Sequence, residues 1–274
     1  MPLPALLRML RNLQINQFVL ISLFVLLVAT NGALWASVCT VTKENANYST
    51  DNGSENTASV TANINAIGDF VAITAYCYSS CTPISVTLGA QSAIKTSISG
   101  NPGPGNPGTG QGFIFYILSS TASGSQTLTF TASGSHTDIQ TSYVDFSPSA
   151  GCTFNHDVDY PVGTGTGGTV NTPSITPSAG DLLFNFTYTS EHINSVNSPW
   201  SCPIYNGQGE SQTCEFVNTI NAAAYIINAA SGTTTNNMSL IHDTDSWQAL
   251  ITSFRVSNND PPPNAPSSLT AVVH

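Results

Sequence analysis

The chain has 274 residues, enough to bury one large hydrophobic core or two smaller ones, and only 7% of its residues are charged. Typical soluble domains carry about 25% charged residues, so Ser, Thr, Asn and Gly must supply the polar surface, a composition that favours strands over helices. The formal net charge is −10. Because binding to a phosphate backbone requires Lys and Arg, this charge excludes a nucleic-acid-binding protein.

The first 36 residues have the layout of a secretory signal peptide. Arg8 and Arg11 form a basic region, the run Phe18–Val28 is apolar, and small residues follow as far as Ala36. We therefore expect residues 1–36 to be removed and the mature protein to be secreted or attached to the cell surface. The alternative is an uncleaved segment, through which alone the chain would contact a membrane.

All six cysteines lie after the expected cleavage site, and an even number in an exported chain indicates disulfide bonds. Spacing predicts three bonds: Cys77–Cys81, Cys202–Cys214 and, from the two that remain, Cys39–Cys152. A metal cluster is the alternative, but the Cys-x-x-x-Cys spacing has no His nearby and is a weak zinc signal.

Short apolar and polar alternations predict an all-β fold. In Asp181–Tyr188 the apolar side chains fall on one face, and in Gln126–Thr131 they alternate with threonines. Phe113–Leu118 and Ala222–Ile227 are apolar on both faces, which is typical of central strands covered on each side. The stretch Asn101–Gly110 is rich in Pro and Gly and predicts an exposed loop.

An internal repeat relates residues 58–147 to residues 169–255. Each half places Gly-Asp just before a strand, at Gly68-Asp69 and Gly180-Asp181, and each later has an Ala-Ser-Gly turn and a Gln…Phe closing segment 108 residues apart. Tandem domains are one explanation. Because no linker separates the halves, we instead expect residues 37–257 to form one antiparallel β-sandwich, of jelly-roll type and built from two similar halves.

The remaining segment, 258–274, begins with a stiff Pro-rich spacer, and its Ala265–Val273 resembles the first strand of a fibronectin type III domain. The body has Gly-Asp-Leu-Leu-Phe at 180–184, Ala-Ser-Gly turns and a closing strand with Trp247 and Phe254. In these features it resembles a family of secreted bacterial β-sandwich domains that often precede such modules in surface proteins. This resemblance implies a fold and a surface location, and it brings no catalytic residues.

Two Asp-x-Asp motifs predict a calcium site. Asp157 and Asp159 would share one face of an extended strand, as would Asp243 and Asp245, and grouped carboxylate oxygens suit Ca²⁺. The alternative is that these aspartates cap ordinary turns.

Two aromatic residues are candidates for ligand binding. Trp200 lies beside Pro199 and Cys202 in a loop with Tyr205, where an exposed ring could stack on a sugar. The alternative is that Trp200 covers the Cys202–Cys214 bond. Trp247, in an alternating strand, is expected in the core.

No catalytic motif stands out, so we expect a non-catalytic binding or adhesion module whose partner is a polysaccharide or another surface ligand. A structural spacer or an extracellular filament subunit is the first alternative. A glycoside hydrolase is the second, because Glu210 and Glu215 flank Cys214 and such enzymes use two facing carboxylates.

Overall fold

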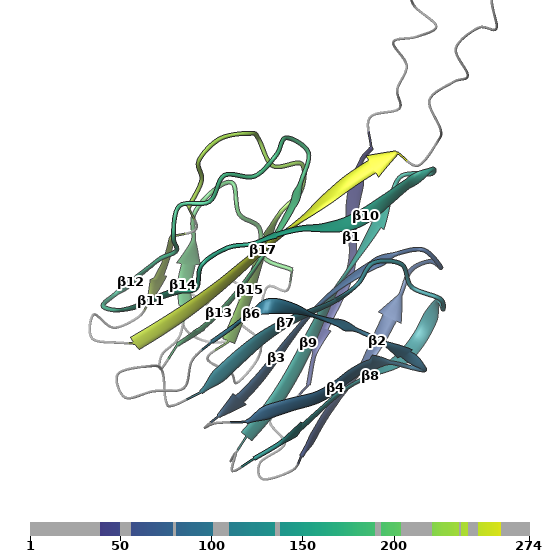
Figure 1. Ribbon diagram of the computed structural model, residues 1–274, viewed down its shortest axis with the longest axis horizontal. Helices are drawn as coiled ribbons and strands as arrows, with labels where there is room; N and C mark the ends of the chain where they lie inside the picture. The colour runs from purple at the N-terminus through teal and green to yellow at the C-terminus, as the bar shows by residue number, and fades with distance from the viewer. Residues whose placement is uncertain are drawn as a thin grey trace, which may run out of the picture. The chain divides into compact units, whose positions relative to one another are not determined.

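The computed structural model describes residues 39–49, 56–78, 81–100, 110–134, 138–189, 193–203, 221–235, 237–240 and 246–258. These residues form strands joined by turns, and the paired strands are antiparallel throughout, which confirms the expected all-β fold (Figure 1). Within this part of the chain, no helix has the length and apolar character needed to cross a bilayer. The expected signal peptide, residues 1–36, and the fibronectin-like segment, residues 265–273, lie outside it.

The first half of the chain is a complete jelly roll of two sheets. One sheet has the order β1 (Val41–Tyr48), β9 (Asp138–Pro148), β3 (Phe70–Tyr78), β7 (Gln111–Ile117) and β6 (Ile94–Ser99). The other has the order β2 (Thr57–Ile64), β8 (Gly124–Ser133), β4 (Thr82–Leu88) and β5 (Gln91–Ser92). The chain crosses from one sheet to the other at most connections, which is how a jelly roll buries the space between its sheets.

The second half repeats this strand order. One sheet runs β10 (Cys152–Asp159), β17 (Ser246–Asn258), β13 (Leu182–Thr189) and β15 (Asn221–Ile226), and β11 (Gly163–Thr166) continues along β17 after β10. The other runs β12 (Thr169–Asn171), β16 (Asn237–Leu240) and β14 (Ile193–Val196). Each half therefore has its own pair of sheets, so the expected antiparallel jelly-roll architecture built from two similar halves is present with four sheets in all in the described part of the chain.

The four sheets form three buried layers of side chains. The first core lies between the sheets of the first jelly roll, and includes Leu128 and Phe130 from one face of β8. The second core lies between the sheets of the second jelly roll. A third cluster, here called the seam, joins the sheet β1-β9-β3-β7-β6 to the sheet β10-β17-β13-β15. These two inner sheets are covered on both faces, which explains why residues 113–117 of β7 and 222–226 of β15 are apolar on both faces.

The seam contacts are reciprocal. Phe146 in the first jelly roll meets Tyr225 in the second edge-on, with ring centroids 5.3 Å apart. Phe254 and Tyr116, which hold the equivalent positions with the jelly rolls exchanged, also meet edge-on, at 5.1 Å. Such exchange of partners is the property of a surface that packs on a copy of itself about a two-fold axis.

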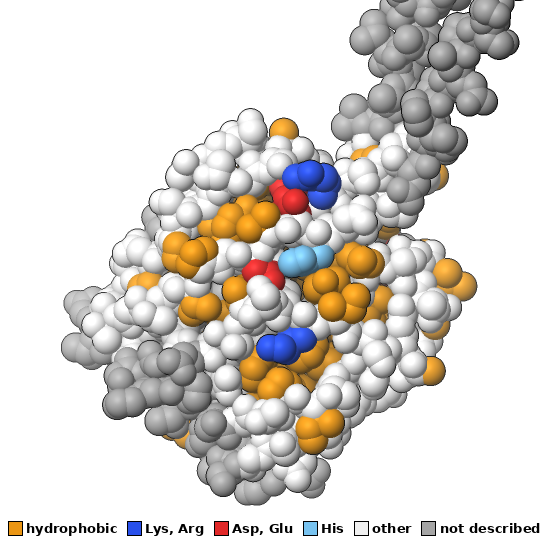
Figure 2. Space-filling model, in the orientation of Figure 1, with side chains coloured by type: hydrophobic (Ala, Val, Ile, Leu, Met, Phe, Trp, Pro, Cys, Tyr) orange, Lys and Arg blue, Asp and Glu red, His pale blue; other side chains and the backbone are white. Residues whose placement is uncertain are grey.

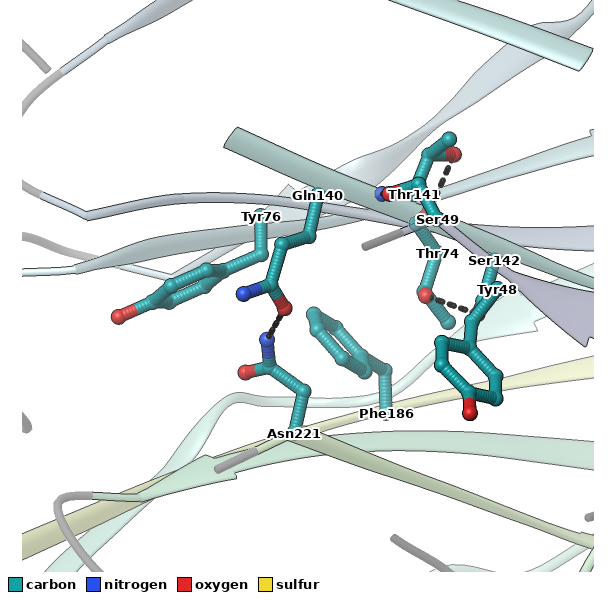
Figure 3. A pocket seen from close by; sticks show the side chains of 9 residues that line it. All are labelled: Tyr48, Ser49, Thr74, Tyr76, Gln140, Thr141, Ser142, Phe186 and Asn221. Carbon is teal, nitrogen blue, oxygen red and sulfur yellow. Dashed lines mark hydrogen bonds between the residues drawn. The ribbon is translucent and has the colours of Figure 1, made fainter. Parts of the chain in front are cut away.

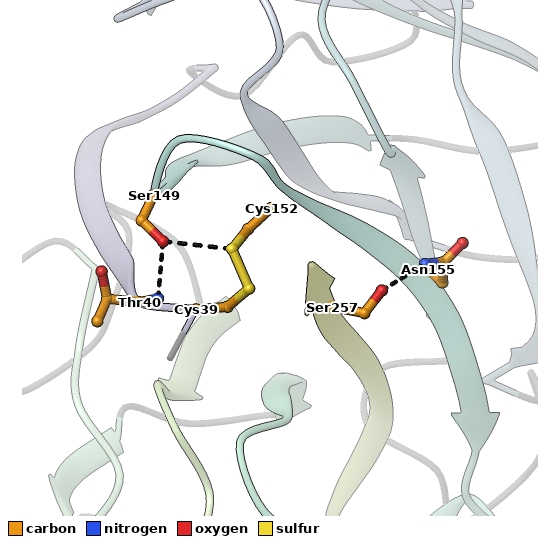
Figure 4. The surroundings of a disulfide bond; sticks show 6 residues. All are labelled: Cys39, Thr40, Ser149, Cys152, Asn155 and Ser257. Atoms are coloured by element: carbon orange, nitrogen blue, oxygen red, sulfur yellow. Dashed lines mark hydrogen bonds between the residues drawn. A yellow bond between two sulfur atoms is a disulfide. The ribbon is translucent and has the colours of Figure 1, made fainter. Parts of the chain in front are cut away.

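A disulfide ties the jelly rolls together at the end where the chain enters and leaves the described body. Cys39 precedes β1 and is bonded to Cys152, the first residue of β10, with their Cα atoms 5.8 Å apart (Figure 4). Cys152 is the register partner of Asn258, the last residue of β17. We call this the terminal end. The opposite end of the inner sheets carries Tyr76 and Tyr188 near the ends of β3 and β13, and we call it the tyrosine end.

Candidate functional site

The best-defined polar sites lie near the terminal end of each jelly roll, where the first strand bulges against the last. In β1 the register skips between Lys43 and Ala46, so that Glu44 and Asn45 lie opposite Asp145 of β9. A bulge of this kind places two residues against one and redirects their side chains.

The second jelly roll has the same bulge. The register of β10 skips between His156 and Asp159, which sets Asp157 and Val158 opposite Ser253 of β17. Glu44 lies five residues after Cys39, and Asp157 lies five residues after Cys152, so the two bulges are equivalent.

The repeated Gly-Asp motif builds the second element of each site. Asp69 accepts a hydrogen bond from the backbone N–H of Ala66 at 2.7 Å, and Asp181 accepts one from Ser178 at 2.9 Å. The glycine before each aspartate has a positive φ, 98° at Gly68 and 88° at Gly180, which only glycine adopts without strain. The repeat found in the sequence therefore encodes one turn, used twice, that buries a carboxylate.

In the second jelly roll a guanidinium balances part of the negative charge at this site. Arg255 donates to Asp157 at 3.0 Å and to Ser178 Oγ at 2.8 Å, and its Nε lies 3.8 Å from Asp181 Oδ1. The pKa of Asp181 is raised overall. Burial and the charge of Asp157 raise it by more than the hydrogen bond from Ser178 and the charge of Arg255 lower it. The arrangement is a closed charge cluster of two carboxylates around one cation.

The first jelly roll has three carboxylates in the corresponding place. Asp145 is fully buried, at 0% exposure, and its Oδ2 accepts the N–H of Asn65 at 2.8 Å, while Oδ1 is buried and accepts no hydrogen bond of standard geometry. Asp69 Oδ1 accepts the hydroxyl of Ser147 at 2.7 Å. Burial, together with the charges of Asp69 and Glu44, raises the pKa of Asp145 to about 7, against the lowering effects of Asn65 and of the Asn45 side chain.

The bulge in β10 separates the two aspartates that the sequence placed on one face. Asp157 pairs with Arg255, whereas Asp159 accepts hydrogen bonds from Ser97 N at 2.7 Å and from Thr252 Oγ1 at 2.8 Å. Asp159 also lies 2.8 Å from His156 Nε2. The expectation of a shared face was wrong, because one extra residue in the strand reverses the alternation.

Asp243 and Asp245 lie outside the described residues. The strand that follows them begins at Ser246, and Asp159 pairs with Thr252 of that strand. In the described part of the chain, no three His, Cys, Asp or Glu side chains are arranged to hold a metal ion. A four-aspartate calcium site stays a prediction.

The aromatic candidates also differ from expectation. Trp200 is only 5% exposed, belongs to the second core, and donates its indole N–H to the carbonyl of Thr235 at 3.1 Å. Its ring is therefore not an exposed stacking platform. Tyr205 lies outside the described residues, as do Glu210 and Glu215. Trp247 lies in the second core, as expected.

The disulfide Cys77–Cys81 is formed, as is Cys39–Cys152, so two of the pairs predicted from spacing are present. Cys202 is also disulfide-bonded, and its expected partner, Cys214, lies outside the described residues. The sequence contains a further sign of the internal repeat, because Cys-Thr occurs at Cys39-Thr40 and again at Cys152-Thr153. This dipeptide recurs 113 residues apart and marks the start of both repeats, upstream of the limits assigned from the sequence.

A small cavity at the tyrosine end bridges the two inner sheets. In Figure 3, Gln140 of β9 points across the seam toward Asn221 of β15, whose Nδ2 donates to Gln140 Oε1 at 2.7 Å. The cavity has a volume of about 10 Å³, which suits about one water molecule. Its position and size make it part of the packing between the jelly rolls rather than a substrate site.

An open groove of about 360 Å³ lies along the edges of β4 and β6 in the first jelly roll. Its lining is mainly apolar: Pro83, Ile84, Val86, Ala93 and Phe115, with Ser85, Ser92 and Lys95 as the polar members. Ile84 is 63% exposed. Figure 2 shows apolar side chains gathered in patches on one face of the molecule, with few charged groups among them.

No protein-family model matches the chain, and no curated protein matches it. Among solved structures it is similar to the major capsid protein P2 from bacteriophage PM2, at 8% sequence identity and a TM-score of 0.28. The likeness covers 81% of this chain and 99% of that one. A likeness this distant bears on neither the function nor the assembly of the present protein. The disulfides and the β-sheet fold by themselves fit an extracellular protein.

Proposed function

We propose that the protein is a secreted or cell-surface binding module without catalytic activity, held by its terminal end and facing its ligand with the tyrosine end. The observation that carries this proposal is the position at which the chain enters and leaves the described body. Cys39 and Asn258 both lie beside Cys152, so the chain enters and leaves the body at one place. Whatever precedes residue 39 or follows residue 258 connects to the same end.

This placement argues against the spacer alternative. A spacer separates the elements before and after it by its own length, which requires its two ends to lie at opposite ends of the body. Here the entry point, Cys39, lies 5.8 Å from Cys152 between Cα atoms, and the exit point, Asn258, lies about one strand spacing, roughly 5 Å, from the same residue, so entry and exit are at most about 11 Å apart. A body inserted in this way projects from its attachment, as a binding head does, and adds almost no length between its neighbours.

The rigidity of the body supports the same proposal. The seam buries aromatic rings from both jelly rolls, and the Cys39–Cys152 bond closes their terminal end. A rigid scaffold that carries connecting segments at its free end is the usual arrangement of binding proteins built on β-sandwiches. The partner class that we propose is a polysaccharide or another ligand on a cell surface.

The proposal is tested by the orientation of the immobilised protein. The protein is attached to beads through a tag following residue 258 or, in a second preparation, through a cysteine substituted for exposed Tyr78 near the tyrosine end. Glycan arrays and whole cells are then probed with both preparations. We expect the protein attached through the tag after residue 258 to bind its ligand, and the protein attached through position 78 not to bind it. Equal binding by both preparations, or none by either, contradicts the proposal, and filaments in electron micrographs would favour the filament alternative.

A further inference from the structure

We infer that the first jelly roll binds a divalent cation of the oxygen-preferring class, Ca²⁺ being the probe, between Glu44, Asp69 and Asp145. The cation would take the place that the Arg255 guanidinium holds in the second jelly roll. This inference is independent of the proposed binding function.

The first step is the equivalence of the two sites. Asp69 and Asp181 occupy the same Gly-Asp turn, and Glu44 and Asp157 occupy the same bulge. Ser147 and Arg255 each follow the last seam phenylalanine of their jelly roll, Phe146 or Phe254, by one residue. Ser147 contacts Asp69, just as Arg255 lies beside Asp181.

The second step is the charge at each site. The second jelly roll surrounds one cation with two carboxylates, Asp157 and Asp181, and has a neutral residue, Ser253, opposite the bulge. The first jelly roll has Asp145 opposite its bulge and Ser147 where the arginine would be. The exchange adds one negative charge and removes one positive charge. In the part of the chain described, neither Asp69 nor Asp145 pairs with Lys, Arg or His.

The third step is an observation that separates this site from a simple acidic cluster. The Asp145 carboxylate is fully buried and is oriented through its Oδ2 by the backbone N–H of Asn65. Its Oδ1 is buried without a standard hydrogen bond. Buried polar atoms in native proteins nearly always have a well-formed hydrogen bond, and a buried carboxylate oxygen that lacks one and lies near other carboxylates is in an environment that a cation stabilises.

The chemistry of the surroundings suits a hard cation. Calcium accepts six to eight oxygen ligands, including amide, hydroxyl and water oxygens, and tolerates irregular geometry. Asn45, Asn65 and Ser147 offer such oxygens beside Asp69 and Asp145. The three carboxylates do not converge as a ligand group in the described structure. Binding therefore requires the half-buried side chain of Glu44 to turn inward from the bulge.

The experiment measures thermal unfolding and calorimetric binding of the purified protein in chelator and in excess CaCl₂. We expect calcium to raise the melting temperature of the wild type, because a ligand that binds only the folded state stabilises it. Asp145→Asn should remove most of this rise. Ser147→Arg, which copies the second jelly roll, should remove it as well while keeping the melting temperature in chelator at or above that of the wild type.

The matched control is Asp157→Asn, which alters the equivalent position in the second jelly roll and should leave the calcium response unchanged. A wild type that shows neither a binding signal nor a shift in melting temperature overturns the inference. So does a response that survives Asp145→Asn, or one that is lost only in Asp157→Asn. If Ser147→Arg fails to fold, Asp145→Asn with the Asp157→Asn control still decides the question.

Discussion

Tyr76 and Tyr188 occupy equivalent positions in the two jelly rolls, eight residues after Gly68 and Gly180, and their rings contact each other with centroids 5.3 Å apart. Equivalent residues touch only close to the axis that relates them. At the opposite end of the body, the bonded pair Cys39 and Cys152 is also an equivalent pair. The relating axis therefore runs lengthwise through the seam, and both jelly rolls point their corresponding ends in the same direction.

The tyrosine contact depends on glycine in a neighbouring strand. A β-carbon at Gly112 of β7 would lie 2.5 Å from Tyr188 Cε1 and 2.8 Å from Phe186 Cε1. We expect Gly112→Ala to lower the free energy of unfolding by about 1–3 kcal/mol, because overpacked cores must shift their side chains. Denaturant unfolding measures the change. Exposed Ser125→Ala is the control, and equal midpoints for the two variants would show that the seam accommodates the added carbon.

The reciprocal seam predicts that one jelly roll can pair with itself. Residues 40–149 alone, without Cys39 because its partner Cys152 is absent, would expose apolar seam residues such as Phe70 and Tyr116, and a second copy offers a surface built on the same plan. We therefore expect this fragment to be dimeric in analytical ultracentrifugation, and Tyr116→Lys to shift it toward monomer. Substitution of exposed Thr42 by Lys is the control. A folded fragment that stays monomeric at high concentration would show that the seam requires both halves.

The alternation of residues was sufficient to predict the strands of the inner sheets, since Leu182, Phe184 and Phe186 do share the seam face of β13. The Gly-Asp repeat was visible because a turn that needs a positive φ and a capping carboxylate restricts both residues. The number of sandwiches was harder to infer. The sequence of a jelly roll that has no linker after it cannot be told apart from that of half a larger sandwich. The two differ only once the repeat is followed back to Cys39 and Cys152, where each jelly roll begins.

The sites were less predictable than the strands, for a local reason. A bulge is one extra residue with no sequence signature of its own, and in β10 it sends Asp157 to Arg255 and Asp159 to His156. Trp200 illustrates a second limit. Its neighbours in sequence suggest a loop, but its ring is buried in the second core and donates its indole N–H to Thr235, which is distant in sequence.

The two disulfides described should differ in their effect on stability. Cys39–Cys152 closes a loop with a sequence separation of 113, and Cys77–Cys81 closes one with a separation of 4. In the chain-entropy account the longer loop stabilises the fold by about 5 kcal/mol and the shorter by about 2 kcal/mol. Paired Cys→Ser variants compared by denaturant unfolding should show this order. The reverse order would indicate that strain or residual structure outweighs loop closure.

The hydrogen bonds to Asp159 predict how the stability of the folded protein responds to acid. Burial raises the pKa of its carboxyl group, but hydrogen bonds from Ser97, His156 and Thr252 outweigh burial, and the net effect is a lowered pKa. A carboxyl group with a lower pKa in the folded state stabilises the fold above its unfolded pKa, and this contribution is lost as the pH falls through the folded value. We therefore expect the wild type to lose stability below about pH 4, the ordinary pKa of Asp.

Asp159→Asn should be less stable near neutral pH and should lose less on acidification, as measured by urea unfolding at a series of pH values. Ser97→Ala, which removes one donor and leaves the carboxyl group, should reduce the acid dependence without abolishing it. Parallel stability curves for the wild type and Asp159→Asn across this range would mean that the hydrogen bonds to Asp159 contribute nothing to the folded state.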